Sequence, residues 1–400
     1  MTASPKALVE APVIKWMRAS SGYSLDDLAH KLGTSHDVVR AWEDGEELPS
    51  MAQVRKLAGV YKRPISDLFL MEPPQSTPIP HDFRRTMGFI GERYSPQLRH
   101  ELRASARRRQ LALDLIEENQ EAIPETISLR IKKTQDPEDV GQAVRKLLKV
   151  TTAEQKSWRG DPRKAYNAWR SRLEGLGVLV FQIATVARDE MHGFCLATQP
   201  LPVIGINRKL KPNGRTFAML HELTHILIGE AALCDIDDTV HRNPLEQLTE
   251  VFCNHVAGAV LVSAKDLLSE PQVARRPPAS EDWLDDDIAL LAKTYTVSEE
   301  VVLRRLLTLG RTTRDFYASK RTGYLKRYAQ MERDERESQK DADMKRNMPQ
   351  EKLSDLGRRF TRLILSTYHA DRISMADASE YLGLKAKNLG KIDALLMEGT

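Results

Sequence analysis

Two histidines four residues apart, with a glutamate beside the first, are the residues best suited to chemistry in this chain. His221, Glu222 and His225 form an HExxH pattern inside an apolar run. Residues four apart on an α-helix share one face, so both imidazoles can reach one metal ion. From its place beside the first ligand, Glu222 can face a water on the metal and act as a general base. The pattern predicts a zinc-dependent hydrolase, and its structural alternative is an amphipathic helix with two core histidines.

A third metal ligand is expected from the next helix-like segment. Glu250 begins an apolar run, and Asn254, four residues later, lies on the same helical face. We predict that Glu250 is the third zinc ligand and that Asn254 holds a ligating imidazole by a hydrogen bond. Glu246 is the nearest rival ligand, and a solvated carboxylate is the structural alternative for Glu250.

Three other side chains near these motifs are weighed for smaller roles. His241 lies in a loop-like stretch before Pro244 and could stabilise the oxyanion of a tetrahedral intermediate. Cys253 is rotated away from Glu250 on a helix, so we expect a small core residue rather than a zinc thiolate. His255 also lies off the face of Glu250 and is not expected to bind the metal.

Helices and short strands must position these residues. Gly229 is expected to end the HExxH helix. Upstream, residues 177–183 are apolar and β-branched, and residues 193–198 and 202–207 suggest two further strands. Such a sheet could form one wall of a peptide cleft, where an edge strand pairs with an extended substrate. The predicted fold class is mainly α with a small β-sheet, an α+β fold.

The length and composition are typical of a globular protein with several domains. The chain has 400 residues, of which 41% are apolar, and no run approaches the roughly 18 apolar residues of a membrane helix. Three scattered cysteines argue against a disulfide framework, and the N-terminus lacks a secretory-type leader. We therefore expect a cytoplasmic protein with no membrane partner. A net charge of +4 means that any DNA binding must be local.

Residues 9–70 have the pattern of several short helices separated by turns. Ser24 is predicted to cap a helix that ends at Gly33, and Ser35 to cap a second that ends at Gly45. Two helices joined by a short turn are the helix-turn-helix arrangement.

The stretch from Leu28 to Pro49 resembles the phage-repressor type of helix-turn-helix found in xenobiotic-response-element-like regulators. The resemblance implies a five-helix domain whose second motif helix enters the major groove. The DNA-binding candidates are then Ser35, His36, Asp37, Arg40 and Ala41. Residues 1–70 carry nine basic and nine acidic side chains, a weak charge for a DNA binder, so a protein-docking or dimerisation role is the alternative.

The metal motifs and their flanks resemble the ImmA/IrrE family of metallopeptidases. The residues that carry the resemblance are Asn207-Arg208, 217–230, 250–254 with Leu261, and 297–306. The resemblance implies a gluzincin-like zinc domain in which His221, His225 and Glu250 bind Zn²⁺ and Glu222 is the catalytic base. It also implies a substrate class, transcriptional repressors, whose cleavage releases a regulon.

Prolines and charge suggest where the domains divide. A Pro-rich stretch reads as an extended linker, and Ser95-Pro96 then predicts the start of a long helix. That helix carries a basic stretch, either a solvated face or a phosphate contact, made of Arg99, Arg103, Arg107, Arg108 and Arg109. The predicted divisions are a helix-turn-helix domain (1–71), a linker (72–94), a zinc metallopeptidase domain (95–318, catalytic core about 175–310), a charged linker or helix (319–350) and a small helical C-terminal module (351–400).

These observations predict a zinc endopeptidase that cleaves a transcriptional repressor or a similar regulatory protein. The helix-turn-helix would dock DNA or protein, so double-stranded DNA and a homodimer are further candidate partners. The alternative is a DNA-binding transcriptional regulator whose peptidase-like domain is a sensor or protein-binding platform with little turnover. An intact Glu222 argues against that alternative, because a structural zinc site needs no base. An amidase acting on small substrates would use the same zinc chemistry.

Overall fold

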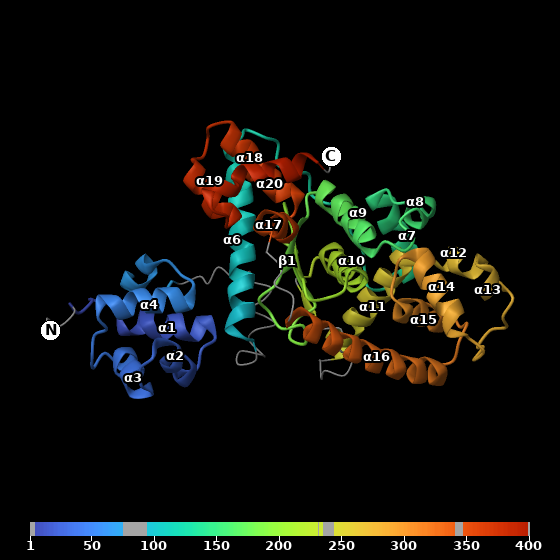
Figure 1. The fold of residues 1–400 in the computed structure, drawn as a ribbon, viewed down its shortest axis with the longest axis horizontal. Helices are drawn as coiled ribbons and strands as arrows, with labels where there is room; N and C mark the ends of the chain where they lie inside the picture. Colours follow the sequence, from blue (N-terminus) through green and yellow to red (C-terminus); the bar gives the residue numbers. More distant parts are fainter. Residues whose placement is uncertain (1–4, 75–93, 231, 235–243, 341–346, 399–400) are drawn as a thin grey trace. The chain divides into compact units, whose positions relative to one another are not determined.

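The computed structural model describes residues 5–74, 94–230, 232–234, 244–340 and 347–398. It is mainly helical with one small sheet, as predicted (Figure 1). The chain forms two compact units, one of Met1–Arg108 with Thr185–Glu190 and the other of Arg109–Ala184 with Met191–Thr400. Among the described residues, none of the helices is long and apolar enough to cross a membrane.

The N-terminal unit holds a set of short helices around one apolar core. They are α1 (Ala11–Ser21), α2 (Leu25–Leu32), α3 (His36–Asp44), α4 (Met51–Tyr61) and the 3₁₀ helix η1 (Ile65–Phe69). The predicted caps of the motif are confirmed: the side chains of Ser24 and Ser35 accept hydrogen bonds from backbone amides, and Gly33 and Gly45 end their helices in the left-handed conformation. Trp42 fills the centre of this core.

Two arginines of the basic stretch after the linker differ from the prediction, whereas Arg107 is exposed as a solvated face requires. Ser95 caps α6 (Pro96–Glu118) as expected, accepting from the amide of Leu98. Arg103, however, is only 1% exposed, and its guanidinium donates to the carbonyl of Ser20 in the last turn of α1 at 3.1 Å. Arg99 is also buried and donates to Ala19 in the same turn. The last carbonyls of a helix have no intrahelical partner, and these two arginines satisfy them instead of facing solvent or phosphate.

The second unit is built on a four-stranded sheet in the order β1-β3-β2-β4. Its strands are β1 (Leu179–Ile183), β2 (Gly193–Leu196), β3 (Val203–Asn207) and β4 (Ala232–Cys234). β1 and β3 run parallel, and β2 is antiparallel to both β3 and β4. The first three strands confirm the predicted ones, and every residue in them is buried. β4 was not predicted, because a three-residue strand is recognisable only by its pairing.

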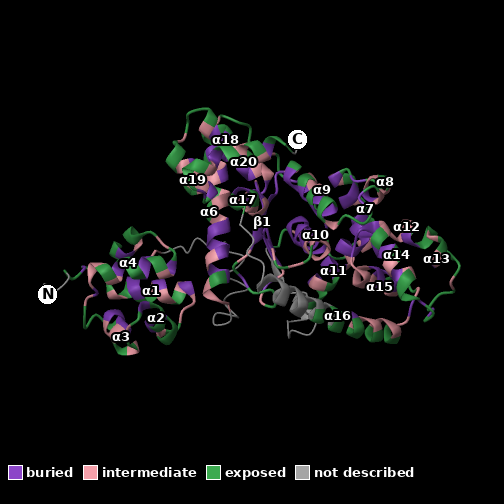
Figure 2. Cartoon of the chain, viewed as in Figure 1, coloured by how far each residue is buried: buried purple, intermediate pink, exposed green. Residues whose placement is uncertain are grey.

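Helices cover this sheet and enclose the predicted metal helix, α10 (Pro212–Ile228). α10 packs against β2, β3, α9 (Pro162–Gly175) and α11 (Pro244–Leu261), and α11 packs on α7 (Pro137–Leu148). Most of α10 is buried (Figure 2). It ends at Gly229 in the left-handed conformation, as predicted. The remaining helices before residue 310 are α8 (Thr152–Lys156), α12 (Ala264–Ser269), α13 (Pro271–Ala274), α14 (Asp285–Tyr295) and α15 (Glu299–Thr308).

The C-terminal helices belong to the same unit as the sheet. They are α16 (Arg314–Lys340), α17 (Met348–Leu356), α18 (Arg358–His369), α19 (Met375–Leu382), η2 (Ala386–Asn388) and α20 (Leu389–Met397). The rings of Phe360 in α18 and Phe181 in β1 pack in a T-shaped arrangement, with centroids 5.5 Å apart. Ser374 caps α19, and Gly383 ends it in the left-handed conformation.

Candidate metal centre

Three predicted metal ligands come together where α10 crosses α11. The Nε2 atom of His221 lies 3.2 Å from the Nε2 atom of His225. The two carboxylate oxygens of Glu250 lie 3.2 Å from His221 Nε2 and 3.5 Å from His225 Nε2. Among the described residues, these three form the cluster of histidine, cysteine and carboxylate side chains that could hold a metal ion.

The spacing and chemistry of these atoms fit Zn²⁺. Around a tetrahedral zinc with bonds of about 2.0–2.1 Å, neighbouring ligand atoms lie about 3.3 Å apart. The three observed separations, 3.2, 3.2 and 3.5 Å, are close to that value. Two imidazoles and one carboxylate are also the donor set of open catalytic zinc sites, which leave one position for water or substrate.

Burial and charge set the protonation preferences of this cluster. Burial alone would lower the pKa of His221, but the hydrogen bond and charge of Glu250, helped by Glu222 and Asn254, raise it. Burial lowers the pKa of His225 despite its bond to Glu250. Burial opposes the charged form of Glu250, yet both histidines together hold the pKa of that carboxyl well below its usual range. Glu250 is therefore an anion, which is the form that binds a metal.

Glu222 lies beside this cluster in a closely packed position. Its side chain is fully buried. A Cβ atom built on Gly193, the first residue of β2, would lie only 2.8 Å from Oε1 of Glu222 and 3.1 Å from its Cγ. The absence of a side chain at Gly193 therefore makes room for the carboxylate. Sequence reasoning missed this residue, since a glycine at the start of a strand carries no signal of what packs on it.

The other side chains weighed around the motifs fall into three groups. Asn254 is buried and is one of the groups that raise the pKa of His221, which places it beside that imidazole. Cys253 is fully buried with a free thiol, and burial raises its pKa, as expected of a core residue. His255 is turned to Glu138, with Nε2 2.8 Å from the carboxylate. His241 lies outside the described residues, as does the side chain of Glu246.

The DNA-binding candidates all lie at the start or on the surface of α3. Ser35 is the N-cap, and Asp37 and Arg40 are exposed. His36 and Ala41 are half-buried, and His36 Nδ1 lies 2.7 Å from a carboxylate oxygen of Asp26 in α2.

Comparisons with known proteins match two regions of the chain. Residues 173–307 match the family model described as an IrrE N-terminal-like domain, of the M78 peptidase family, and residues 14–68 match a helix-turn-helix model. The chain is also similar to the radiation response metalloprotease IrrE of Deinococcus deserti, with 36% identity over 72 residues, which are 17% of this chain and 26% of the relative. The match thus spans about a quarter of that relative's length. Residues 173–307 are accordingly similar to an IrrE-type peptidase domain, and residues 14–68 to a helix-turn-helix domain.

Proposed function

We propose that this protein is a zinc-dependent endopeptidase that cleaves a regulatory protein, with transcriptional repressors as the substrate class. The observation that carries the proposal is the meeting of His221, His225 and Glu250 at zinc-ligand spacing beside the buried carboxylate of Glu222. A structural zinc site has four closed protein ligands and needs no such base. The similarity to a metalloprotease supports the same chemistry.

In this proposal each side chain has a defined part in the reaction. When bound by His221, His225 and Glu250, Zn²⁺ would polarise the scissile carbonyl and lower the pKa of water. Glu222 accepts the proton of the attacking water and delivers it to the leaving amine. The packing of Gly193 fixes the carboxylate in place, and Asn254 orients the imidazole of His221.

The sheet supplies a reason to expect an extended peptide as substrate. β4 lies at one edge of the sheet and, within the part of the chain that the structure describes, pairs only with β2. It begins directly after α10, the helix with both histidines. An extended peptide can add to such an edge through backbone hydrogen bonds. Peptide binding there would bring a scissile bond toward α10.

The helix-turn-helix domain is proposed to deliver the peptidase to its target. Asp37 and Arg40 are exposed on α3 and available to a partner. Because basic and acidic side chains balance over residues 1–70, a protein or a protein–DNA complex suits this surface better than bare DNA. A repressor bound to DNA would offer this domain both a protein surface and DNA.

Cleavage of a repressor encoded beside the gene tests this function. The zinc-loaded wild type, Glu222→Gln and the control Glu117→Gln, which changes an exposed glutamate of α6, are each incubated with the repressor. Mass spectrometry should find specific fragments with the wild type and the control but not with Glu222→Gln, which keeps its ligands and lacks a base. Fragments that persist in Glu222→Gln would contradict the proposed base. Bound zinc without cleavage would favour a regulator with little turnover.

A further inference from the structure

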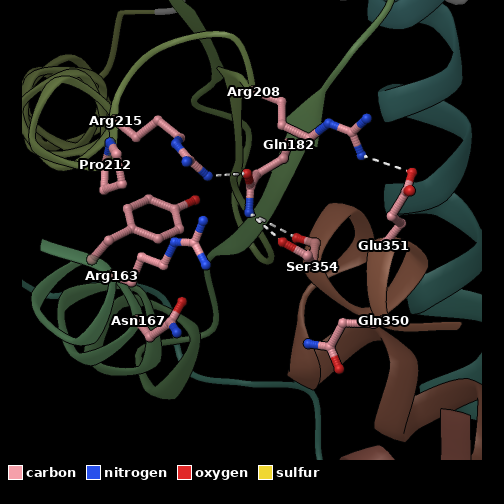
Figure 3. A pocket seen from close by; sticks show the side chains of 10 residues that line it. Arg163, Asn167, Gln182, Arg208, Pro212, Arg215, Gln350, Glu351 and Ser354 are labelled. Carbon is pink, nitrogen blue, oxygen red and sulfur yellow. Dashed lines mark hydrogen bonds and ion pairs between the residues drawn. The ribbon is translucent and has the colours of Figure 1, made fainter. Parts of the chain in front are cut away.

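A cavity of about 360 Å³ opens in the second unit. Its walls come from α9, β1, the first turn of α10 and α17 (Figure 3). The size lies in the range of small-molecule sites, about 300–1,000 Å³. The three proposed zinc ligands are not among the lining residues. The cavity therefore needs an explanation separate from the metal centre.

Positive charge dominates the lining of this cavity. Three arginines line it, and the one carboxylate among the lining residues is that of Glu351. Arg208 is already matched, because it lies 3.4 Å from Glu351 and 3.1 Å from Asp355. Arg163 is exposed and its side chain has no hydrogen bond or ion pair within the described part of the chain. The guanidinium of Arg215 adds a second charge that has no carboxylate partner among the residues the structure describes.

Arg215 is held in place entirely by neutral groups. Its Nε donates to the carbonyl of Leu210 at 3.0 Å and its Nη1 to the side-chain oxygen of Gln182 at 2.6 Å (Figure 3). Burial lowers the pKa of Arg215. Tyr166 raises this pKa, but the nearby arginines, Arg163 among them, lower it further. A half-buried cation crowded by like charges is stabilised by an anion that enters.

A buried hydroxyl gives an independent sign of a ligand. Tyr166 lines the cavity and is 2% exposed, and its hydroxyl has no hydrogen-bond partner among the described residues. Burial raises its pKa, so the hydroxyl keeps its proton and can donate it. Buried donors are nearly always paired in folded proteins, so an acceptor brought by a ligand in the cavity would satisfy this one.

The start of α10 favours the same kind of ligand. Pro212, its first residue, lines the cavity but has no N–H to donate, and the preceding Lys211 gives no side-chain cap. The positive end of the helix dipole nevertheless favours negative charge there. The guanidinium and hydroxyl groups supply the donors, which suits an anion with several acceptor oxygens.

We propose that this cavity binds the phosphate group of a small phosphorylated molecule. Arg163 and Arg215 hold phosphate oxygens with their N–H groups, and the Tyr166 hydroxyl donates to another oxygen. Arginine is suited to this because its planar fork of donors matches phosphate. The rest of the cavity accommodates the organic part. Since Arg215 and His221 share α10, such a ligand would act on the helix that carries the metal ligands.

Calorimetric titration of the full-length protein tests the proposal without measuring peptidase activity. The probes are ribose 5-phosphate, inorganic phosphate and, as the uncharged comparison, ribose. Arg163→Ala removes an exposed charge, and Tyr166→Phe removes only the unpartnered hydroxyl. The matched controls are Arg314→Ala on α16, also exposed, and Tyr61→Phe, whose hydroxyl is likewise buried and without a partner in the described chain.

Saturable binding of a phosphate-containing probe is the expected result, with none for ribose. Each cavity variant should weaken it about tenfold, the usual effect of losing one hydrogen bond to a charged group, while the controls bind as the wild type does. Tighter binding of ribose 5-phosphate than of inorganic phosphate would assign the site to a phosphorylated metabolite, and equal binding would assign it to free phosphate. No saturable binding of either, or binding that both cavity variants leave unchanged, would overturn the proposal.

Discussion

Substituting alanine for Gly193 tests whether packing sets the position of the proposed base. The added Cβ would lie 2.8 Å from Oε1 of Glu222, whereas ordinary contact begins near 3.4 Å. The carboxylate oxygen must therefore retreat by about 0.6 Å from a fully buried position with little free space. A reacting group misplaced by about 1 Å can cost about a hundredfold in rate, so we expect kcat/KM to fall about ten- to a hundredfold.

The assay for this variant combines repressor cleavage with zinc content and a thermal melt. Zinc content should stay at the wild-type value, because the three atoms nearest to a Cβ at Gly193 all belong to Glu222 and none to a proposed ligand. Gly175→Ala at the end of α9 is the control, since a Cβ there meets no atom within 4 Å. Full activity in Gly193→Ala would refute the packing argument. Loss of zinc together with activity would refute it too, because the damage would then lie in the ligands.

Two further predictions concern stability. Glu138→Gln should destabilise the protein by about 3 kcal/mol at neutral pH, because Glu138 accepts from both Nη atoms of the buried Arg305, at 2.6 and 2.8 Å. Burial would raise the pKa of Glu138, but hydrogen bonds from His255 and Arg305 lower it from 4.5 to about 2. This stabilisation is thus complete above pH 4.5 and disappears as the pH falls through about 2. In urea unfolding, the difference in the free energy of unfolding between wild type and Glu138→Gln should therefore narrow in acid. A difference that stays constant with pH would contradict this prediction. Without ligand, Tyr166→Phe should leave Tm unchanged or raise it by up to about 3 °C, because the substitution removes a buried hydroxyl that has no partner among the described residues. A lower Tm would contradict the claim that this hydroxyl is unpaired.

Local signals in the sequence were enough to predict much of the helical framework. Ser24, Ser35 and Ser95 each cap a helix where expected, and Gly229 ends α10. These features depend on neighbours a few residues away, so they can be read without knowing the fold. The HExxH spacing belongs to the same class, since a single helix brings His221 and His225 together.

Features that depend on distant partners could not be predicted in the same way. The basic stretch of α6 has the composition of a solvated face, yet Arg103 is buried against the last turn of α1. β4 exists through its pairing with β2, and Gly193 matters through its contact with Glu222. Tyr166 packs in the apolar core of the second unit, but its sequence position gives no indication that its hydroxyl lacks a partner among the described residues.

The zinc content of Glu250→Gln tests the central claim most directly. The account predicts one zinc ion per wild-type chain after dialysis, and zinc binding at least about a hundredfold weaker in Glu250→Gln, measured by competition with a chelator. The control is Glu246→Gln, which changes the nearest rival ligand and should bind zinc as the wild type does. Zinc bound equally by wild type and Glu250→Gln, with both correctly folded by circular dichroism, would contradict the proposed centre.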